Sequence, residues 1–289
     1  MEDRDWLILK TIYEEKNMSK AAQVLHVSQP ALTYRLQQLE TEFNTKIVHR
    51  SNKGVEFTGQ GEYLAKYAVD MLNKLRMTKE IVESMENKVQ GTLRLGVSRN
   101  FARYNLPPLL SNFLTKYPDI KFHLITGFSS EITDLVYKEE FHIGIIRGNN
   151  NWKEQKLLLA QEPVCIVSKS EIDSNSLPAL PRIHYETEPS LQSVINNWWE
   201  ENFTQPPFIT MRVDRIDTCK EMVKNGLGYA IVPKACLTED DILYQINLTT
   251  RDQKEILRDT WVIYRNSSLE LTMIRAFIDF IKSIKQEGV

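Results

Sequence analysis

The stretch NMSKAAQVLHVSQPALTYRLQQLE, residues 17–40, decides the fold of the first part of the chain. Ser19 stands where a serine hydroxyl caps the first turn of a helix, which we predict over residues 20–25. Ser28 repeats this signal ahead of a second helix, and Pro30 falls in the first turn of that helix, where a missing N–H is no loss. Two helices separated by three residues predict a helix-turn-helix.

Apolar spacing predicts which faces of these helices are buried. Residues 5–16 form a preceding helix whose apolar face carries Trp6, Leu9, Ile12 and Tyr13. After Ser28 the buried stripe is predicted to consist of Ala31, Leu32, Leu36, Leu39 and Phe43. Amides, hydroxyls and arginine are the side chains that pair with base edges in the major groove. The rest of this helix presents such groups, at Gln29, Thr33, Tyr34, Arg35, Gln37 and Gln38.

A heptad-like apolar seam follows, with steps of four and three residues. Its members are Leu64, Ala68, Met71, Leu75, Thr78, Val82, Met85 and Val89. The other faces are charged, and the helix would form a rod about 40 Å long. One interpretation is a surface helix packed on its own domain. We favour a helix that pairs with a second copy of the chain, and hence a homodimer or homotetramer.

Beyond Gly91 the pattern changes to short apolar runs, at residues 92–97, 120–125 and 143–146. Amphipathic stretches of ten or more residues separate these runs. Strands alternating with helices predict an α/β domain with a mostly parallel sheet. The length of 289 residues also suggests two units.

Composition limits the class of protein. With 42% hydrophobic residues, 26% charged residues and a net charge of −2, the chain has an ordinary globular composition and no bulk attraction for nucleic acid. Residues 17–54 are mildly basic, with five cations against two acids. The start lacks a secretory signal, and no apolar run approaches the roughly 18 residues of a membrane span, so we expect a cytoplasmic protein without a membrane partner.

Residue constellations for catalysis or metal binding are missing from the sequence. The cysteines Cys165, Cys219 and Cys236 are odd in number and have no Cys-x-x-Cys spacing, which favours neither disulfides nor a zinc site. The five histidines stand apart, with no His-Glu-x-x-His motif and no Gly-x-Ser-x-Gly nucleophile elbow. We therefore expect no catalytic residue, no metal and no cofactor, and interpret the chain as a regulator and not an enzyme.

The motifs together resemble the amino-terminal signature of LysR-type transcriptional regulators. The residues that carry the resemblance are Ser19-Lys-Ala-Ala22, Leu25-His-Val-Ser-Gln-Pro-Ala-Leu32, Leu39-Glu40, Arg50 and Thr58-x-x-Gly61. The resemblance implies an α+β multidomain chain. Its parts would be a winged helix-turn-helix at residues 1–58, a linker and dimerisation helix at 59–89, and a periplasmic-binding-protein-like effector domain at 91–289. Residues 48–57 would be the wing, turning at Asn52-Lys53-Gly54.

The same resemblance implies a DNA-binding set, with double-stranded promoter DNA as the partner. The residues are Ser28, Gln29, Pro30, Thr33, Tyr34, Arg35, Gln38, Arg50 and Lys53. Arg50 and Lys53 would hold phosphates, and Gln29, Pro30, Thr33, Tyr34 and Gln38 would lie near bases. For Arg35 the choice between base and phosphate stays open. Tyr34 is bulkier than usual in such proteins and would alter the DNA sequence that is read.

In the effector domain, the resemblance implies two subdomains with a small molecule between them. Subdomain I would comprise residues 91–161 and 267–289, subdomain II residues 162–266, with crossings near 160–164 and 264–268. Strand ends and helix starts collect anions, and arginine adds a fork for a carboxylate. The predicted effector residues are Ser98, Arg99, Asn100, Thr126, Ser129, Arg147, Thr187, Ser190 and Thr218. We expect an anionic effector; alternatively, the arginines are solvated or paired with acids.

Two other interpretations were weighed. The run Asn225-Gly226-Leu-Gly228-Tyr-Ala-Ile231 mimics a dinucleotide fingerprint but precedes an apolar strand instead of following one, so it fits a helix stop. An extracytoplasmic solute-binding protein would share the sensor fold but would need a signal peptide and no helix-turn-helix. The sequence does not distinguish an activator, for which RNA polymerase would be a further partner, from a repressor.

Overall fold

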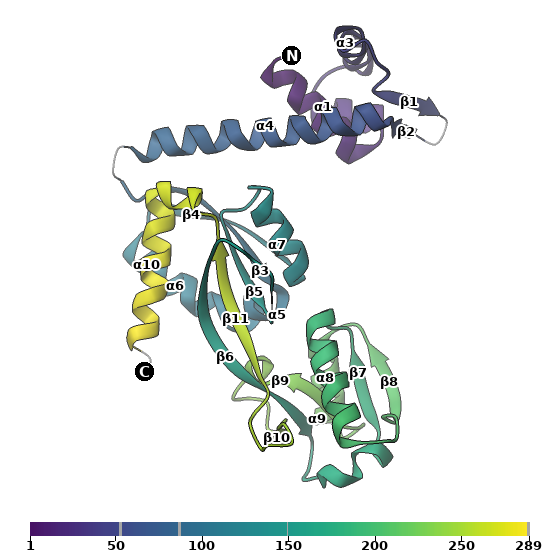
Figure 1. The fold of residues 1–289 in the computed structure, drawn as a ribbon, viewed down its shortest axis with the longest axis vertical. Helices are drawn as coiled ribbons and strands as arrows, with labels where there is room; N and C mark the ends of the chain where they lie inside the picture. Colours follow the sequence, from purple (N-terminus) through teal and green to yellow (C-terminus); the bar gives the residue numbers. More distant parts are fainter. Residues whose placement is uncertain (52–53, 86–87, 149, 288–289) are drawn as a thin grey trace. The chain divides into compact units, whose positions relative to one another are not determined.

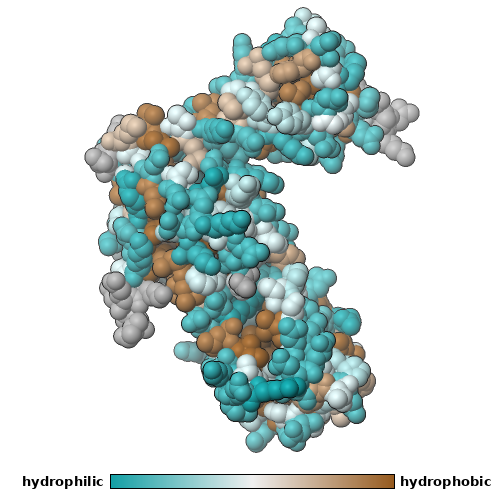
Figure 2. Space-filling view, in the orientation of Figure 1, coloured by the Kyte–Doolittle hydropathy of each residue, from teal (hydrophilic) through white to brown (hydrophobic). Residues whose placement is uncertain are grey.

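The computed structural model describes residues 1–51, 54–85, 88–148 and 150–287. The chain folds into two compact units, Met1–Glu86 and Asn87–Val289 (Figure 1). The surface of each unit is mostly hydrophilic, with separate hydrophobic areas (Figure 2). Within the described residues, no helix combines the length and the apolar character that crossing a bilayer requires.

The first unit is a helix-turn-helix with a β-hairpin and a long helix, and the predicted helix-turn-helix and hairpin are confirmed. Val48 pairs with Phe57 in the hairpin. The elements are α1 (Asp3–Glu15), α2 (Met18–Val24), α3 (Gln29–Glu42), β1 (Val48–Ser51), β2 (Gly54–Phe57) and α4 (Gly59–Ser84).

One of the two predicted helix caps is correct. The Ser28 hydroxyl accepts from the N–H of Ala31 at 3.3 Å, as expected. The Ser19 cap is wrong, because Asn17 caps α2 by accepting from the N–H groups of the next helical residues at 2.9 and 3.0 Å. Starting the helix earlier brings Met18 into the core, and asparagine is as good a cap as serine.

The core of the first unit forms where the stripe on α3 meets α1. Leu32, Leu36 and Leu39 are buried against Leu9 and Ile12. The prediction that Ala31 and Phe43 complete this stripe is wrong, since both are exposed. Phe43 is the C-terminal cap of α3, past the regular helix, so helical periodicity no longer determines the direction of its side chain.

Helix α4 packs on the first unit only through part of its seam. Leu64 and Ala68 join the core of this unit. Val82 and Met85, in contrast, are 58% and 71% exposed. Val89 was predicted to continue the seam, but the helix ends at Ser84, so this prediction is wrong. The beginning of the seam is therefore packed within the chain, as the first interpretation has it, and its end is exposed; pairing with a second copy stays a prediction.

The second unit contains a seven-stranded sheet in the order β10-β6-β11-β5-β3-β4, with β9 also paired to β6, and a separate parallel pair β7-β8. Its strands are β3 (Gly91–Ser98), β4 (Ile120–Gly127), β5 (Ile143–Arg147), β6 (Gln155–Ser168), β7 (Arg182–Tyr185), β8 (Ile209–Val213), β9 (Ala230–Pro233), β10 (Tyr244–Asn247) and β11 (Leu257–Tyr264). Its helices are α5 (Arg99–Tyr104), α6 (Leu106–Lys116), α7 (Ser129–Tyr137), α8 (Pro189–Asn202), α9 (Ile216–Lys224) and α10 (Thr272–Glu287), with 3-10 turns η1 (Ser174–Ala179), η2 (Lys234–Cys236) and η3 (Ser267–Glu270).

Two long antiparallel strands, β6 and β11, join the two subdomains (Figure 1). Subdomain I holds β3, β4 and β5, which run parallel as predicted, and subdomain II holds β7, β8 and β9. The outward crossing near 160–164 lies within β6. The return crossing is not at 264–268, because residues 260–264 of β11 already pair with β5 in subdomain I. The chain crosses back to subdomain I within strand β11 itself, whereas the sequence prediction placed the crossing after the end of this strand.

The last helix, α10, packs on subdomain I as expected. The rings of Phe113 and Phe277 lie 5.0 Å apart with their planes nearly perpendicular. The glycine run after α9 is a helix stop followed by β9, also as expected. Gly226 has φ +79°, a left-handed conformation that favours glycine, and its N–H bonds to the carbonyl of Val223.

Candidate nucleic-acid interface and effector cavity

Helix α3 presents an exposed polar surface at its beginning. Gln29, Pro30 and Tyr34 are exposed, and Tyr34 is 63% accessible. The Ser19 hydroxyl of α2 lies 3.1 Å from Gln29 Oε1 and holds the amide at the start of α3. Amide and phenol groups on a capped helix fit the major groove in size and chemistry.

The other members of the predicted DNA-binding set lie around this surface. Thr33 and Gln38 are half-buried on α3, and the Ser28 hydroxyl is engaged as its cap. Arg50 lies on β1, and its side chain is outside the described residues, as is the whole of Lys53.

Arg35 has an internal role that the sequence did not reveal. Its Nε and Nη2 donate to the two carboxylate oxygens of Asp5 at 2.6 and 2.8 Å, and its Nη1 donates to Gln38 Oε1 at 2.7 Å. Asp5 is only 1% exposed. The hydrogen bonds from Arg35 hold the pKa of Asp5 below its ordinary value. The guanidinium therefore ties α1 to α3, an internal role beside which the base or phosphate contact considered from the sequence stays a prediction.

The hairpin is anchored by a second carboxylate. Glu40 Oε1 accepts from the N–H of Ile47 at 3.0 Å, and its Oε2 pairs with Lys46 at 2.8 Å. The Leu39-Glu40 motif thus connects the end of α3 to the start of the hairpin, a connection that spacing along the chain alone does not reveal.

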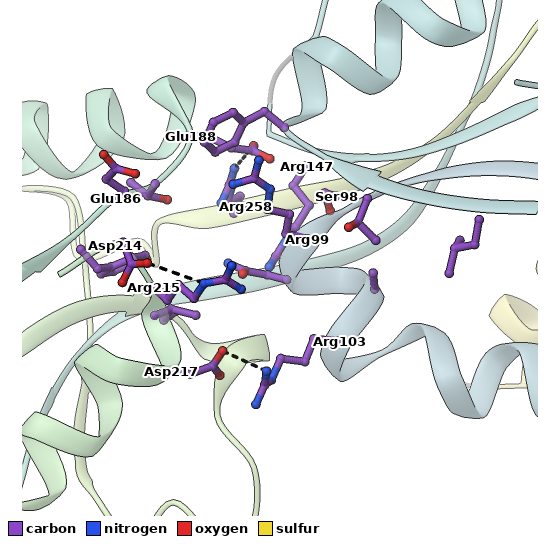
Figure 3. Close-up of a pocket in the computed structure, with 18 residues that line it drawn as sticks. Ser98, Arg99, Arg103, Arg147, Glu186, Glu188, Asp214, Arg215, Asp217 and Arg258 are labelled. Atoms are coloured by element: carbon purple, nitrogen blue, oxygen red, sulfur yellow. Dashed lines mark hydrogen bonds and ion pairs between the residues drawn. The ribbon is translucent and has the colours of Figure 1, made fainter. Parts of the chain in front are cut away.

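The second unit has a cavity of about 650 Å³ between its subdomains (Figure 3). Six of the nine predicted effector residues line it: Ser98, Arg99, Asn100, Thr126, Arg147 and Thr187. Ser129, Ser190 and Thr218 do not. The prediction did not include the other twelve lining residues, namely Ala102, Arg103, Leu124, Phe128, Tyr185, Glu186, Glu188, Asp214, Arg215, Ile216, Asp217 and Arg258.

The missed acids follow the same strand-end rule as the residues that were found. Glu186 comes directly after β7, Glu188 follows two residues later, just before α8, and Asp214 comes directly after β8. Because an anionic effector was expected, the sequence prediction included Thr187, between the two glutamates, and not the glutamates themselves. Arg258 carries no comparable signal, because it lies on the crossing strand β11.

Ion pairs neutralise most charges of the cavity. Arg103 Nη1 lies 3.1 Å from Asp217 Oδ2 across the two subdomains. Arg215 lies 3.7 Å from its neighbour Asp214, and the buried Arg147 pairs with Glu162. Burial raises the pKa of Glu162, which the charge of Arg147 opposes.

Glu188 bridges the subdomains through Ser129. Its carboxylate accepts from the N–H and the hydroxyl of Ser129 at 3.1 and 3.0 Å, at the start of α7. Arg258, 5% exposed, donates to the same carboxylate at 2.7 Å and lies 3.4 Å from Ser190 Oγ. Ser129 and Ser190, predicted to bind effector, thus belong to a network that holds an acid of the chain itself.

The cysteines are packing residues. Cys165, Cys219 and Cys236 are free and buried, and burial raises the pKa of the Cys236 thiol to about 11. Among the described residues, no three His, Cys, Asp or Glu side chains are grouped to hold a metal ion.

Both parts of the chain match known families. Residues 4–62 match the bacterial regulatory helix-turn-helix protein, lysR family, and residues 86–285 match the LysR substrate binding domain. Two similar proteins are uncharacterized HTH-type transcriptional regulators of Bacillus subtilis (strain 168). YraN is 44% identical over 98% of both chains, and YkuM is 37% identical over 96% of this chain and 95% of its own.

Among solved structures, full-length CbnR in complex with its target DNA has the same fold. The TM-score is 0.71 at 19% identity, over 98% of this chain and 99% of that one. The match spans both units and confirms the predicted architecture of a helix-turn-helix unit followed by a two-subdomain α/β unit. The chain therefore belongs to the LysR family of transcriptional regulators, which confirms the family and the class expected from its first sixty residues.

Proposed function

We propose that this regulator binds promoter DNA as a dimer or tetramer, and that a small molecule with an anionic group, bound in the cavity, changes this binding. The observation that carries the DNA-binding half is the exposed, capped start of α3 with Gln29 and Tyr34 at its surface. CbnR, which has the same fold, has been solved with its target DNA. In this proposal the bases are read by Gln29, Thr33, Tyr34 and Gln38, with Ser28 and Pro30 beside them. The phosphates are held by Arg50 and Lys53. A DNA partner of this kind places the protein in the cytoplasm.

Two helix-turn-helix units, here called heads, must bind the same DNA to give an affinity sufficient for regulation. One α3 offers few phosphate contacts, and the net charge of −2 adds no general attraction for DNA. The open end of the α4 seam, with Val82 and Met85, supports pairing between copies. Paired heads bind an imperfect palindrome whose half-sites are spaced by whole helical turns.

The effector half rests on the cavity between the subdomains. Arg99 is exposed there, and Ser98 Oγ is buried without a hydrogen-bond partner in the structure described. A ligand that binds one arrangement of the subdomains more tightly shifts the equilibrium between arrangements, and thereby the spacing of the heads. RNA polymerase is a further partner if the effector-bound form activates transcription.

A mobility-shift assay with the full-length chain and the DNA upstream of its own gene tests the proposal. Gln29→Ala should lose about 1–3 kcal/mol of binding free energy, and the loss should disappear when one particular base pair of the site is changed. Lys53→Ala should weaken binding to all sequences alike. Gln245→Ala, on the exposed strand β10, is the matched control and should bind as the unchanged chain does. Absence of specific retention, or an equal loss on every sequence for Gln29→Ala, would contradict the proposal.

A further inference from the structure

The two walls of the cavity carry opposite charge (Figure 3). Subdomain I contributes only cations among its charged lining residues, namely Arg99, Arg103 and Arg147. Subdomain II contributes one arginine and four carboxylates, namely Arg215, Glu186, Glu188, Asp214 and Asp217. Arg258 comes from the crossing strand β11.

Among the described residues, all but one of the charged lining side chains on each wall belong to an ion pair. Four of the five arginines pair with acids, in the pairs Arg103–Asp217, Arg147–Glu162, Arg215–Asp214 and Arg258–Glu188. Within the described residues, the two charged lining side chains outside any ion pair are Arg99, on subdomain I, and Glu186, on subdomain II.

Arg99 is held at the cavity without being neutralised. Its guanidinium carbon lies 4.4 Å from the centre of the Phe128 ring, which orients a cation but leaves its N–H groups for another acceptor. Next to it in the chain, Ser98 is 2% exposed, and its hydroxyl has no hydrogen-bond partner within the described structure. A buried hydroxyl beside an unpaired guanidinium provides two donors for one carboxylate.

Glu186 is the corresponding acid on the facing wall. Its backbone N–H is bonded to the carbonyl of Val213 at 3.0 Å, so the residue is fixed at the end of β7 while its side chain is exposed. Figure 3 shows it on the opposite side of the cavity from Ser98 and Arg99. An exposed carboxylate at a cavity wall attracts a cationic group and repels an anion.

A second place for an anion, the start of α7, is already occupied. The N–H and hydroxyl of Ser129 there hold the Glu188 carboxylate. A ligand with two carboxylates would therefore find one free partner at Arg99, and its second carboxylate would face Glu186.

We infer that the effector is a zwitterion of the amino-acid type, whose carboxylate binds Arg99 and Ser98 and whose ammonium group binds Glu186. This inference rests on the proposed function, because it takes the cavity as the effector site. A cavity of about 650 Å³ accommodates a metabolite of this size. The zwitterion neutralises both unpaired charges at once. It links the two subdomains, because its carboxylate binds subdomain I and its ammonium group binds subdomain II.

The test measures binding to the purified full-length chain by thermal shift and calorimetry. The probes are the standard L-amino acids, each with its N-acetyl derivative, which lacks the cation, and its carboxamide, which lacks the anion. At least one amino acid should bind, and both of its derivatives should bind more weakly by about tenfold or more. Glu186→Gln should abolish the preference over the N-acetyl derivative, and Arg99→Gln the preference over the carboxamide. Both side chains are exposed, and melting of the unliganded variants checks their folding.

Glu200→Gln, an exposed substitution on α8 outside the cavity, is the control and should keep every preference. Equal or tighter binding of the N-acetyl derivatives would overturn the inference and leave the proposed anionic effector standing. Tightest binding by carboxamides would overturn both. No binding by any probe would overturn the inference of an amino-acid effector and leave the proposed anionic effector standing. A preference for amino acids that survives Glu186→Gln would overturn the assignment of the ammonium group to that residue.

Discussion

At the scale of the residue, the structure changes the meaning of Arg35. An arginine on the helix that we propose to read DNA suggests a role in binding DNA, and the structure shows that its guanidinium also binds Asp5 of α1 and Gln38. The pair links two helices through residues that lie 30 positions apart in the chain. Removing either partner leaves the other charge in a partly desolvated site, so the pair belongs to the stability of the first unit.

We expect Arg35→Gln to destabilise the first unit by about 2 kcal/mol at neutral pH. This is less than for a fully buried pair, because the Arg35 side chain is 37% exposed. Hydrogen exchange of the amides in α1 and α3 measures the change. The depressed pKa of Asp5 means that the pair stabilises the fold above the ordinary aspartate pKa, about 3.9. The difference between variant and unchanged chain should therefore shrink as the pH falls below this value.

Lys20→Gln, an exposed substitution on α2, serves as the control for Arg35→Gln and should leave exchange unchanged. Equal exchange in Arg35→Gln and the unchanged chain at neutral pH would show that the pair does not stabilise this unit.

At the scale of the element, the start of α4 explains the Thr58-x-x-Gly61 motif. Thr58 Oγ1 accepts from the N–H of Gly61 at 2.9 Å and donates to the carbonyl of Lys46 at 2.6 Å. A Cβ added at Gly61 would lie 1.9 Å from the carbonyl oxygen of Ile47. The motif combines a helix cap with the close approach of helix and hairpin that only glycine permits.

We expect substitution by alanine to have opposite effects at two glycines near this cap. Gly61→Ala should destabilise the first unit by about 2 kcal/mol or more, because the new methyl group collides with backbone and not with a movable side chain. Gly59→Ala meets nothing within 4 Å and should be neutral or stabilising by up to about 1 kcal/mol, as helix propensity predicts. Urea unfolding of both variants, followed by hydrogen exchange in α1 and α4, decides the matter. Equal effects would mean that propensity and not packing sets the requirement at residue 61.

At the scale of the whole molecule, the exposed end of α4 is the feature on which the proposed pairing with a second copy of the chain rests. Val82 and Met85 expose apolar side chains in the single chain, whereas Leu64 and Ala68 on the same seam are packed. A helix whose seam is satisfied over only part of its length gains free energy by pairing the remainder.

We expect Val82→Gln combined with Met85→Gln to weaken dimerisation by about tenfold or more, since burying each side chain contributes about 1.5–3 kcal/mol. Sedimentation equilibrium gives the dimer dissociation constant, and the mobility shift should weaken in parallel. Glu83→Gln, on the exposed polar face between these positions, controls for changes in helix stability. An unchanged dissociation constant in the double variant would exclude this end of α4 from the dimer interface.

The features that could be predicted are those set by neighbours along the chain. The Ser28 cap, the turn before α3, the hairpin and the helix stop at Gly226 depend on groups a few residues apart, which a single sequence displays. The predicted Ser19 cap was wrong although it too concerned near neighbours in the chain, because Asn17 accepts from the N–H groups at the start of α2 instead. The prediction that Phe43 is buried was wrong because helical periodicity ends at the C-terminal cap of α3.

The sequence by itself therefore determined the family, the helix-turn-helix and six lining residues of the cavity, because strand ends and caps are local signals. Only the tertiary structure decided that Arg35 binds Asp5, and that Arg258 reaches Glu188 from 70 residues away. It also decided that, in the part of the chain that the structure describes, Arg99 and Glu186 are the charged lining residues of the cavity outside any ion pair. Which acid neutralises which arginine depends on where the strands cross, and the strength of each pair depends on its burial. Neither quantity is a property of the neighbouring residues in the chain.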